Sequence, residues 1–199
     1  MLEIREATID ELDEVALIHS LMIPYSINST MGINRLKDLY LFTLQDEDSV
    51  LLIATENNRV IGFISGTSNF GNLAKGAKSN VSTKQIINIF MKMNPFRLFV
   101  AVLDFILLSR AFQRQGEFYY FSTWGMLPNS PPAAGSALFR ELVKRAHNSS
   151  SQAVVVNVGK SNSKVLQMYR SLGFLPVAKT FSELILKRQY SFLFIVYLF

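Results

Sequence analysis

Cysteine is absent from this chain of 199 residues, and histidine occurs only twice, as His19 and His147. Without cysteine the chain has no disulfide framework, no thiolate zinc site and no cysteine nucleophile. Two histidines are too few for a metal site built from histidine. We therefore expect a protein that works without a bound metal.

Long apolar runs are also lacking. The longest, residues 98–108 and 192–199, fall short of the roughly 20 apolar residues that a membrane-spanning helix needs. Glu3 and Glu6 lie where a signal peptide needs an uninterrupted apolar segment. We therefore expect no membrane span, no export and a cytoplasmic location.

Positive charge is concentrated in one segment. The whole chain has 20 basic and 15 acidic residues, a net charge of +5. Residues 70–116 contain seven basic residues and a single acidic residue, Asp104, so the remainder is nearly neutral. This distribution argues against a general nucleic-acid binder and favours a local basic surface.

Hydrophobic residues make up 49% of the chain and charged residues 18%. This composition is too apolar for disorder, and the length suits one domain with a full core. No repeat or linker divides the sequence. We therefore expect a single domain over residues 1–199.

Hydrophobic periodicity and turn residues predict the order of the elements. Strands are expected over residues 2–7, 49–55, 60–67, 118–126 and 153–158, with two closing strands over roughly 174–186 and 189–198. Helices are expected from the Thr8–Glu11 capping box to about residue 21, over about 36–45, over 135–147, and from Ser161 to 172. Residues 22–30 and 127–134 are predicted to be loops. A helical insert at residues 70–116, with helices over 81–93 and 96–112, separates the third and fourth strands. This order indicates an α/β fold, a mixed sheet with helices on both faces.

Residues 118–147 form a predicted strand, a loop of small residues and a helix. Such a loop presents backbone N–H groups at the positive end of the helix dipole, which suits a pyrophosphate. The alternative is that the loop only joins the strand to the helix.

A second motif covers residues 162–174. Asn162 is followed by a small apolar residue, Met168-Tyr169 and then Gly173-Phe174. This pattern resembles the second signature of the GCN5-related N-acetyltransferase (GNAT) family, and the resemblance covers about 150 residues outside the insert. It implies a largely antiparallel sheet of about seven strands. It also implies acetyl-CoA as co-substrate and direct transfer of acetyl to a primary amine.

The resemblance implies roles for residues near the second motif. Tyr169 would protonate the coenzyme A thiolate as it leaves; alternatively, its ring packs with Leu172 and Phe174. Asn162 would hold the pantetheine arm or the phosphates; alternatively, it caps a helix together with Ser161.

The resemblance also assigns the cofactor-binding strand and loop. Trp124, Gly125 and Met126 would bulge away from the next strand and offer N–H groups to the pantetheine arm and the thioester carbonyl, with the bulge at Gly125; alternatively, Gly125 packs closely under Trp124. The acetyl-CoA loop would comprise Ser130, Ala133, Ala134, Gly135 and Ser136. Of the family pattern Gln/Arg-x-x-Gly-x-Gly/Ala, only the final position, Gly135, is matched.

A base for the acceptor amine is not evident in the motifs. Glu117, at the start of the splayed strand, is the candidate, acting through a water chain; the alternative is an ordinary surface glutamate. His19 is expected in the core or at a helix end, and His147 beside a helix dipole.

The basic insert resembles that of a GNAT subset found near bacterial cell-surface polysaccharide genes. This implies an amino sugar or nucleotide-linked amino sugar acceptor, with Tyr25, Lys92 and Arg97 as substrate-binding candidates. Alternatively, the insert makes a peripheral contact with an anionic membrane, packs on the domain or forms a homodimer contact.

A rival hypothesis belongs to a different class. Because the acetyl-CoA loop departs from the family pattern, the chain could be a non-catalytic module of the same fold that binds a membrane or a partner protein.

Overall fold

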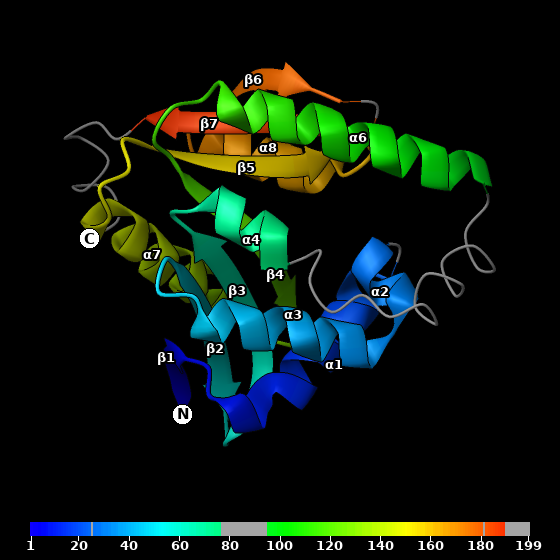
Figure 1. Ribbon diagram of the computed structural model, residues 1–199. Coiled ribbons are helices and arrows are strands. Elements are labelled where there is room, and N and C mark those ends of the chain that lie inside the picture. Colours follow the sequence, from blue (N-terminus) through cyan, green and yellow to red (C-terminus); the bar gives the residue numbers. More distant parts are fainter. Residues whose placement is uncertain (25, 77–94, 181, 190–199) are drawn as a thin grey trace.

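One mixed sheet of seven strands forms the centre of the computed structural model, which describes residues 1–24, 26–76, 95–180 and 182–189 (Figure 1). The strand order is β1-β2-β3-β4-β5-β7-β6, and only β4 and β5 run parallel. The strands are β1 (Leu2–Glu6), β2 (Ser49–Glu56), β3 (Arg59–Thr67), β4 (Tyr119–Met126), β5 (Ala153–Gly159), β6 (Leu175–Lys179) and β7 (Glu183–Gln189). The expected mixed, largely antiparallel fold is confirmed.

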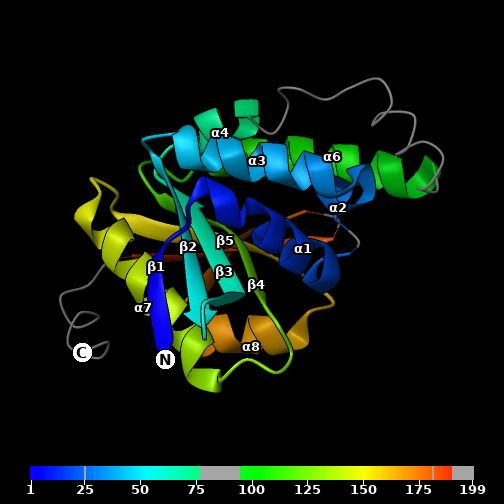
Figure 2. The same ribbon diagram turned by 90° about the horizontal axis from the view of Figure 1, so that it is seen from below.

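Helices cover both faces of this sheet, as Figure 2 shows from below. They are η1 (Ile9–Glu11), α1 (Leu12–Met22), α2 (Ile27–Met31), α3 (Ile33–Gln45), α4 (Phe70–Gly76), α6 (Pro95–Gln113), α7 (Pro132–Asn148) and α8 (Ser163–Ser171). The core residues of α7 and α8 pack on one face, and those of α1, α3, α4 and α6 pack on the other. Among the described residues, no helix is both long and apolar enough to cross a membrane.

The valine run of β5 explains why the sheet needs helices on both faces. Successive strand residues point to opposite faces. Val154, Val156 and Val158 join the core under α7 and α8, whereas Val155 joins the core under α4 and α6. A strand buried on both faces is typical of the centre of a covered sheet.

Local signals in the sequence locate several element boundaries correctly. The Thr8 backbone N–H donates to the Glu11 carboxylate at 2.8 Å, so the predicted capping box opens the first helical segment. Asn57 and Asn58 adopt φ angles of 51° and 62°, which makes the tight turn between β2 and β3.

Other boundaries differ from the prediction. Residues 22–30 are not all loop, because Ser26 caps the short helix α2 by accepting from the Ser29 N–H. Helix α7 begins at Pro132 rather than at residue 135, since proline is well suited to the first turn of a helix. Helix α4 was not predicted. The single strand expected over 174–186 is two strands, β6 and β7. The helix expected over 81–93 lies outside the described residues, as does the strand over 189–198 beyond Gln189.

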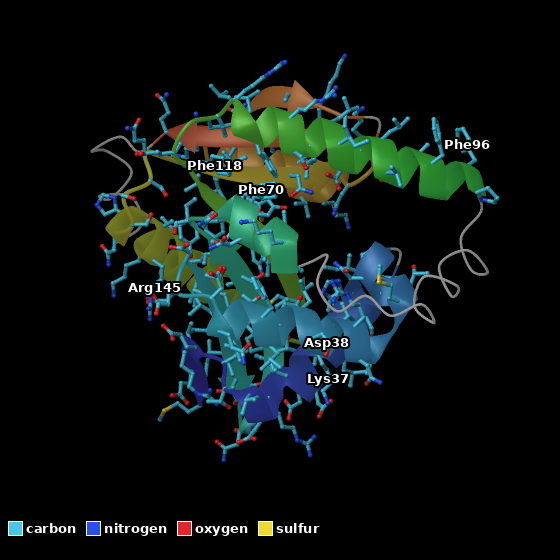
Figure 3. The ribbon with its side chains drawn as sticks, viewed as in Figure 1. Lys37, Asp38, Phe70, Phe96, Phe118 and Arg145 are labelled. Carbon is cyan, nitrogen blue, oxygen red and sulfur yellow. The ribbon has the colours of Figure 1, made fainter. Side chains whose placement is uncertain are left out.

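The described part of the insert packs on the sheet. The Phe112 ring of α6 lies 4.5 Å from the Phe70 ring of α4 and 5.0 Å from the Tyr120 ring of β4. Phe70 and Phe118 lie near the sheet in Figure 3, while Phe96 lies at the outer end of α6 and is 71% exposed. The backbone N–H of Ser182 also donates to Asp104 of α6, at 3.2 Å. These contacts fix α6 beside the start of β7.

Candidate active site

The sheet opens at its middle, between β4 and β5. These strands pair only at Tyr119–Phe121 and Val154–Val156. On its other side, β4 has one more residue than β3: Phe121 faces Gly66 and Thr123 faces Ser65, which leaves Ser122 as a bulge. A bulge bends a strand and increases its twist. Beyond Phe121, β4 therefore leaves β5, and its backbone N–H groups on that side have no partner in β5.

The bulge was predicted at Gly125, and this prediction is wrong. Gly125 is paired with Phe63 in regular register. A Cβ atom on Gly125 would lie 2.7 Å from the Phe63 ring and 3.4 Å from the Ile18 side chain. The glycine is needed for this close packing, against Phe63 rather than under Trp124.

A cleft of about 670 Å³ occupies the opening. Its walls come from α1, α2, β3, β4, β5, α8 and β7. Four predicted site residues line it, namely Trp124, Met126, Asn162 and Tyr169. Polar residues that were not predicted line it as well, among them Ser122, Asn157 and Glu183.

Tyr169 of α8 packs its ring in the core and also lies in the cleft, so its predicted acid role stays a prediction. Its ring packs 5.1 Å from that of Phe174 and 6.3 Å from that of Phe139, and the residue is only 6% exposed. Its side chain also lines the cleft. Burial raises the pKa of the Tyr169 hydroxyl well above its usual value. The phenol is therefore protonated at neutral pH and is available as a proton donor.

Asn162 adopts the capping role. Its Oδ1 atom accepts from the Val165 N–H at 3.3 Å, so Asn162 alone, rather than Ser161, caps α8. Asparagine is among the preferred residues at this position. Asn162 also lies in the cleft lining, where the positive end of the α8 dipole is found.

Two residues of the predicted acetyl-CoA loop, Ser130 and Ala134, make hydrogen bonds within the protein. The Ser130 hydroxyl donates to the Ile61 carbonyl at 2.9 Å, which ties the loop to β3. Ala134 is buried, and its N–H donates to the Pro131 carbonyl at 2.9 Å. Ala133 and Ser136 are exposed in the first turns of α7.

The start of α7 lies directly beside the cleft. Gly135 is its fourth residue, and a Cβ atom there would lie 3.4 Å from the Trp124 ring. Trp124 in turn stacks on Phe139 at 5.8 Å. The indole Nε1 of Trp124 is buried and has no hydrogen-bond partner among the described residues. A buried donor of this kind is satisfied when a ligand supplies an acceptor.

His19 forms a neutral wall of the cleft. Its Nδ1 lies 2.6 Å from the Tyr40 hydroxyl and its Nε2 lies 3.2 Å from the Ser26 hydroxyl. The ring stacks on Phe63, and burial lowers the pKa of His19 to about 4. The histidine belongs to the core, as expected, and is uncharged at neutral pH.

A chain of polar side chains crosses from β4 to β7. The Tyr120 hydroxyl donates to Asn157 Oδ1, and Asn157 Nδ2 donates to Glu183 Oε2 at 2.8 Å. Burial, together with the charge of Asp104, raises the pKa of Glu183 against the lowering effect of the Asn157 hydrogen bond. None of the sequence motifs indicated this chain of side chains. Its signal was Asn157, a polar residue within a run of valines.

Glu117 lies outside this arrangement. It is exposed, precedes β4 and does not line the cleft. The sheet opens toward the other end of β4, so the strand separates Glu117 from Tyr169. Tyr25 and Lys92 lie outside the described residues, and of Arg97 only the backbone within α6 is described. The described residues contain no group of three or more acidic, histidine or cysteine side chains that could hold a metal.

Comparison with known proteins identifies the fold. No protein-family model matches the sequence, and no curated protein matches it. Solved structures do match. A PaiA N-acetyltransferase from Thermoplasma acidophilum, in complex with coenzyme A, is 16% identical with a TM-score of 0.59 over 96% of this chain and 99% of that one. A GNAT-family acetyltransferase from Bacillus cereus is 14% identical with a TM-score of 0.56 over 96% and 99%.

YncA from Salmonella typhimurium, with its cofactor acetyl-CoA, is 15% identical with a TM-score of 0.56 over 96% and 95% of the two chains. These matches cover almost the whole of each chain. The protein described here therefore has the GNAT fold.

Proposed function

We propose that this protein is an N-acetyltransferase that moves acetyl from acetyl-CoA to a primary amine by direct attack. The observation that carries the proposal is the cleft at the β4–β5 opening, where Tyr169 and the bulge at Ser122 meet beside the start of α7. The similarity to acetyltransferase structures, some of which contain coenzyme A or acetyl-CoA, supports it.

The residues on the α7 side suit acetyl-CoA. The first turn of α7, with Gly135 beside Trp124, offers the positive end of a helix to the pyrophosphate. The unpaired edge of β4 offers backbone donors to the amides of the pantetheine arm, and the unsatisfied Nε1 of Trp124 offers one more. Two prolines and the internal bond of Ala134 reduce the number of N–H donors at the helix start.

The reaction needs only groups that the cleft contains. The amine nitrogen attacks the thioester carbon, a C–N bond forms and the C–S bond breaks. Backbone N–H groups of β4 stabilise the negative charge that develops on the carbonyl oxygen. The nitrogen releases a proton to water as the amide forms, while Tyr169 gives its proton to the departing thiolate and recovers one from solvent.

The acceptor can be proposed more finely as an amino sugar or a nucleotide-linked amino sugar. The resemblance to the polysaccharide-associated subset and the basic insert support this. Its contacts would come from Tyr25, Lys92 and Arg97. The described lining of the cleft contains the carboxylate of Glu183 and no lysine or arginine.

Two roles of the insert stay predictions, a peripheral membrane contact and a homodimer contact. Among the described residues, Phe96 and Phe99 are the exposed aromatic side chains on which either contact would depend.

The proposal is tested by mixing the protein with acetyl-CoA and a panel of amino sugars, polyamines and peptides. Release of free coenzyme A thiol, dependent on one class of amine, is the expected result. Binding of acetyl-CoA without thiol release for any amine would favour the rival, a non-catalytic module.

A further inference from the structure

The polar chain from Tyr120 to Glu183 lies on one face of the sheet, and Tyr169 lies on the other. Tyr120 belongs to the core under α4 and α6, together with Val155 of β5 and Ile185 of β7. Because side chains alternate along a strand, Asn157 and Glu183 share that face. Tyr169 belongs to the core under α7 and α8. Both groups line the same cleft, so they meet through the opening of the sheet.

Hydrogen bonds to β5 and to the connection between β6 and β7 hold Glu183 in place. Asn157 of β5 donates to its Oε2, and its backbone N–H donates to the Thr180 hydroxyl at 3.1 Å. Its neighbour Ser182 is bonded to Asp104 of α6. Among the described residues, Oε1 of Glu183 has no hydrogen-bond partner. One carboxylate oxygen is therefore available to a ligand in the cleft.

The same face has room for a substituent in a pocket that adjoins the cleft along β4. A smaller pocket of about 180 Å³ shares Tyr120, Ser122 and Thr123 with the cleft. Apolar side chains form part of its lining, namely Leu39, Phe70, Leu73 and Leu108. A primary amine with a short alkyl group fits this combination of one anion and an apolar wall.

We propose that Glu183, positioned by Asn157, binds the ammonium group of the acceptor and takes the proton that the amine must lose before it attacks. This inference rests on the proposed function. The ammonium gives one proton to the Glu183 carboxylate, and the neutral amine attacks the thioester carbon from the α6 face. As the amide forms, the nitrogen loses a second proton to water. Tyr169 protonates the thiolate from the opposite face.

The surroundings of Glu183 strengthen it as a base. The groups that face it are Asp104 on α6, Asn157 on β5 and Tyr120 on β4, with Tyr169 of α8 close to Tyr120. Burial and the negative charge of Asp104 raise the pKa of Glu183, so its carboxylate holds a proton more strongly than an exposed glutamate does.

The test compares two amines of different basicity at pH 7. n-Butylamine is protonated at this pH and needs a base, whereas O-methylhydroxylamine is already neutral. Glu183→Gln keeps the shape and the hydrogen bond from Asn157 but removes the base. We expect kcat/KM for n-butylamine to fall roughly 10²-fold and that for O-methylhydroxylamine to fall less than about threefold. Glu47→Gln, at an exposed position in the turn before β2, is the matched control and should change neither value.

Each other outcome overturns the inference. Equal losses for both amines would mean that Glu183 only supports the structure, and no loss would exclude it from the reaction. A wild-type protein that binds acetyl-CoA but does not acetylate n-butylamine would contradict the ammonium site while leaving the proposed function to the amine panel. A larger selective loss in Glu117→Gln would assign the base to Glu117 instead. Failure to bind acetyl-CoA would overturn the proposed function itself, and the inference with it.

Discussion

The Tyr169 side chain has a ring that packs in the core and a hydroxyl that is the proposed general acid. Its ring is packed between Phe139 and Phe174, which fixes the direction of the hydroxyl. Burial raises the pKa of the Tyr169 hydroxyl, which keeps the phenol protonated at neutral pH and makes it a weaker acid than an exposed tyrosine. The aromatic packing and the acid role therefore depend on different atoms, and a substitution can separate them.

Tyr169→Phe keeps the ring and removes the acid. We expect kcat to fall roughly 10²-fold or more, with little change in acetyl-CoA affinity, because the hydroxyl acts on the leaving group. Steady-state kinetics and calorimetric titration measure the two quantities. An unchanged kcat, with the chemical step limiting, would remove Tyr169 from the mechanism.

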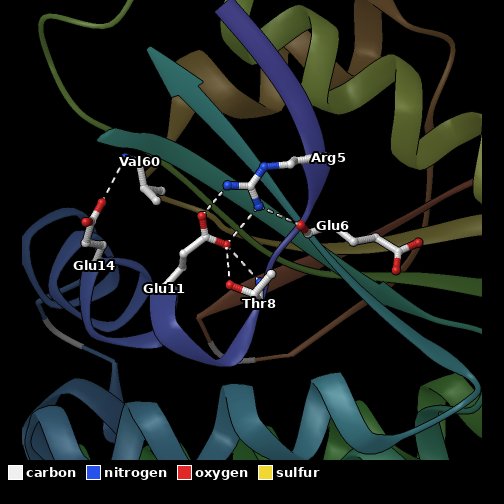
Figure 4. Close-up of polar contacts among 6 residues, drawn as sticks. All are labelled: Arg5, Glu6, Thr8, Glu11, Glu14 and Val60. Carbon is white, nitrogen blue, oxygen red and sulfur yellow. Dashed lines mark hydrogen bonds and ion pairs between the residues drawn. The ribbon is translucent and has the colours of Figure 1, made fainter. Parts of the chain in front are cut away.

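Glu11 shows how one carboxylate fixes the start of the chain (Figure 4). It pairs with Arg5 of β1 and accepts from the backbone N–H of Thr8 at 2.8 Å. The hydrogen bond from Arg5, with smaller contributions from Thr8, lowers the pKa of Glu11 from 4.5 to about 2. The folded state therefore favours the ionised carboxylate more than the unfolded state does.

Glu11→Gln should lower the free energy of unfolding at neutral pH. The difference from the wild-type protein should become smaller as the pH is lowered. A lowered folded-state pKa gives stability that is fully present above the unfolded value of 4.5 and is lost as the pH falls through about 2. Urea unfolding of both proteins between pH 7 and pH 2 measures this, with Glu47→Gln as an exposed control. A difference independent of pH would contradict an electrostatic role for Glu11.

At the scale of elements, the start of helix α7 differs from the acetyl-CoA loop pattern that the resemblance implies. Its first residue is Pro132, and its fourth, Gly135, is the position that matches. A Cβ at Gly135 would make ordinary contact with Trp124 at 3.4 Å. The glycine is therefore not required for packing, and a side chain there would project toward the cleft wall.

Gly135→Asp should abolish acetyl-CoA binding in a protein that still folds. The added carboxylate fills space beside Trp124 and repels the pyrophosphate, whereas Gly135→Ala adds only a methyl group and should retain binding. Calorimetric titration and circular dichroism check the two statements. Equal acetyl-CoA affinity in a folded Gly135→Asp protein would exclude the cofactor from the start of α7.

The sequence predicted the individual helices, strands and turns better than the contacts between them. The valine run of β5, the Thr8–Glu11 capping box and the Asn57-Asn58 turn are local signals, and each gave the correct element. The bulge at Ser122 depends on the register between β3 and β4, which single residues do not encode.

The same reason explains why the sequence did not indicate Glu183 as the proposed base. Asn157 and Glu183 are separated by 26 residues and meet only through the pairing of β5 with β7. Glu117 is close to the cofactor strand in sequence, but β4 directs it away from the opening. The family resemblance pointed to Tyr169, while the proposed acceptor face rests on contacts that only the fold brings together.

At the scale of the whole molecule, the opening in the sheet joins two faces, and we expect one to bind acetyl-CoA and the other to bind the amine. The α7 and α8 face presents a helix start, Trp124 and Tyr169, which suit a thioester and its phosphates. The α4 and α6 face presents Glu183 and a pocket lined in part by apolar residues, which suit an amine. The insert contributes to the second face, since α6 is fixed to the start of β7 through Asp104. In this account the two substrates approach from opposite faces and meet between β4 and β5.

Binding of acetyl-CoA to the wild-type protein tests this account most directly. A ligand that binds only the folded state at 100 times its Kd adds roughly 2.7 kcal/mol to the free energy of unfolding. We expect stabilisation of that size with acetyl-CoA, and its loss in Gly135→Asp. An unfolding curve that millimolar acetyl-CoA leaves unchanged would contradict the account.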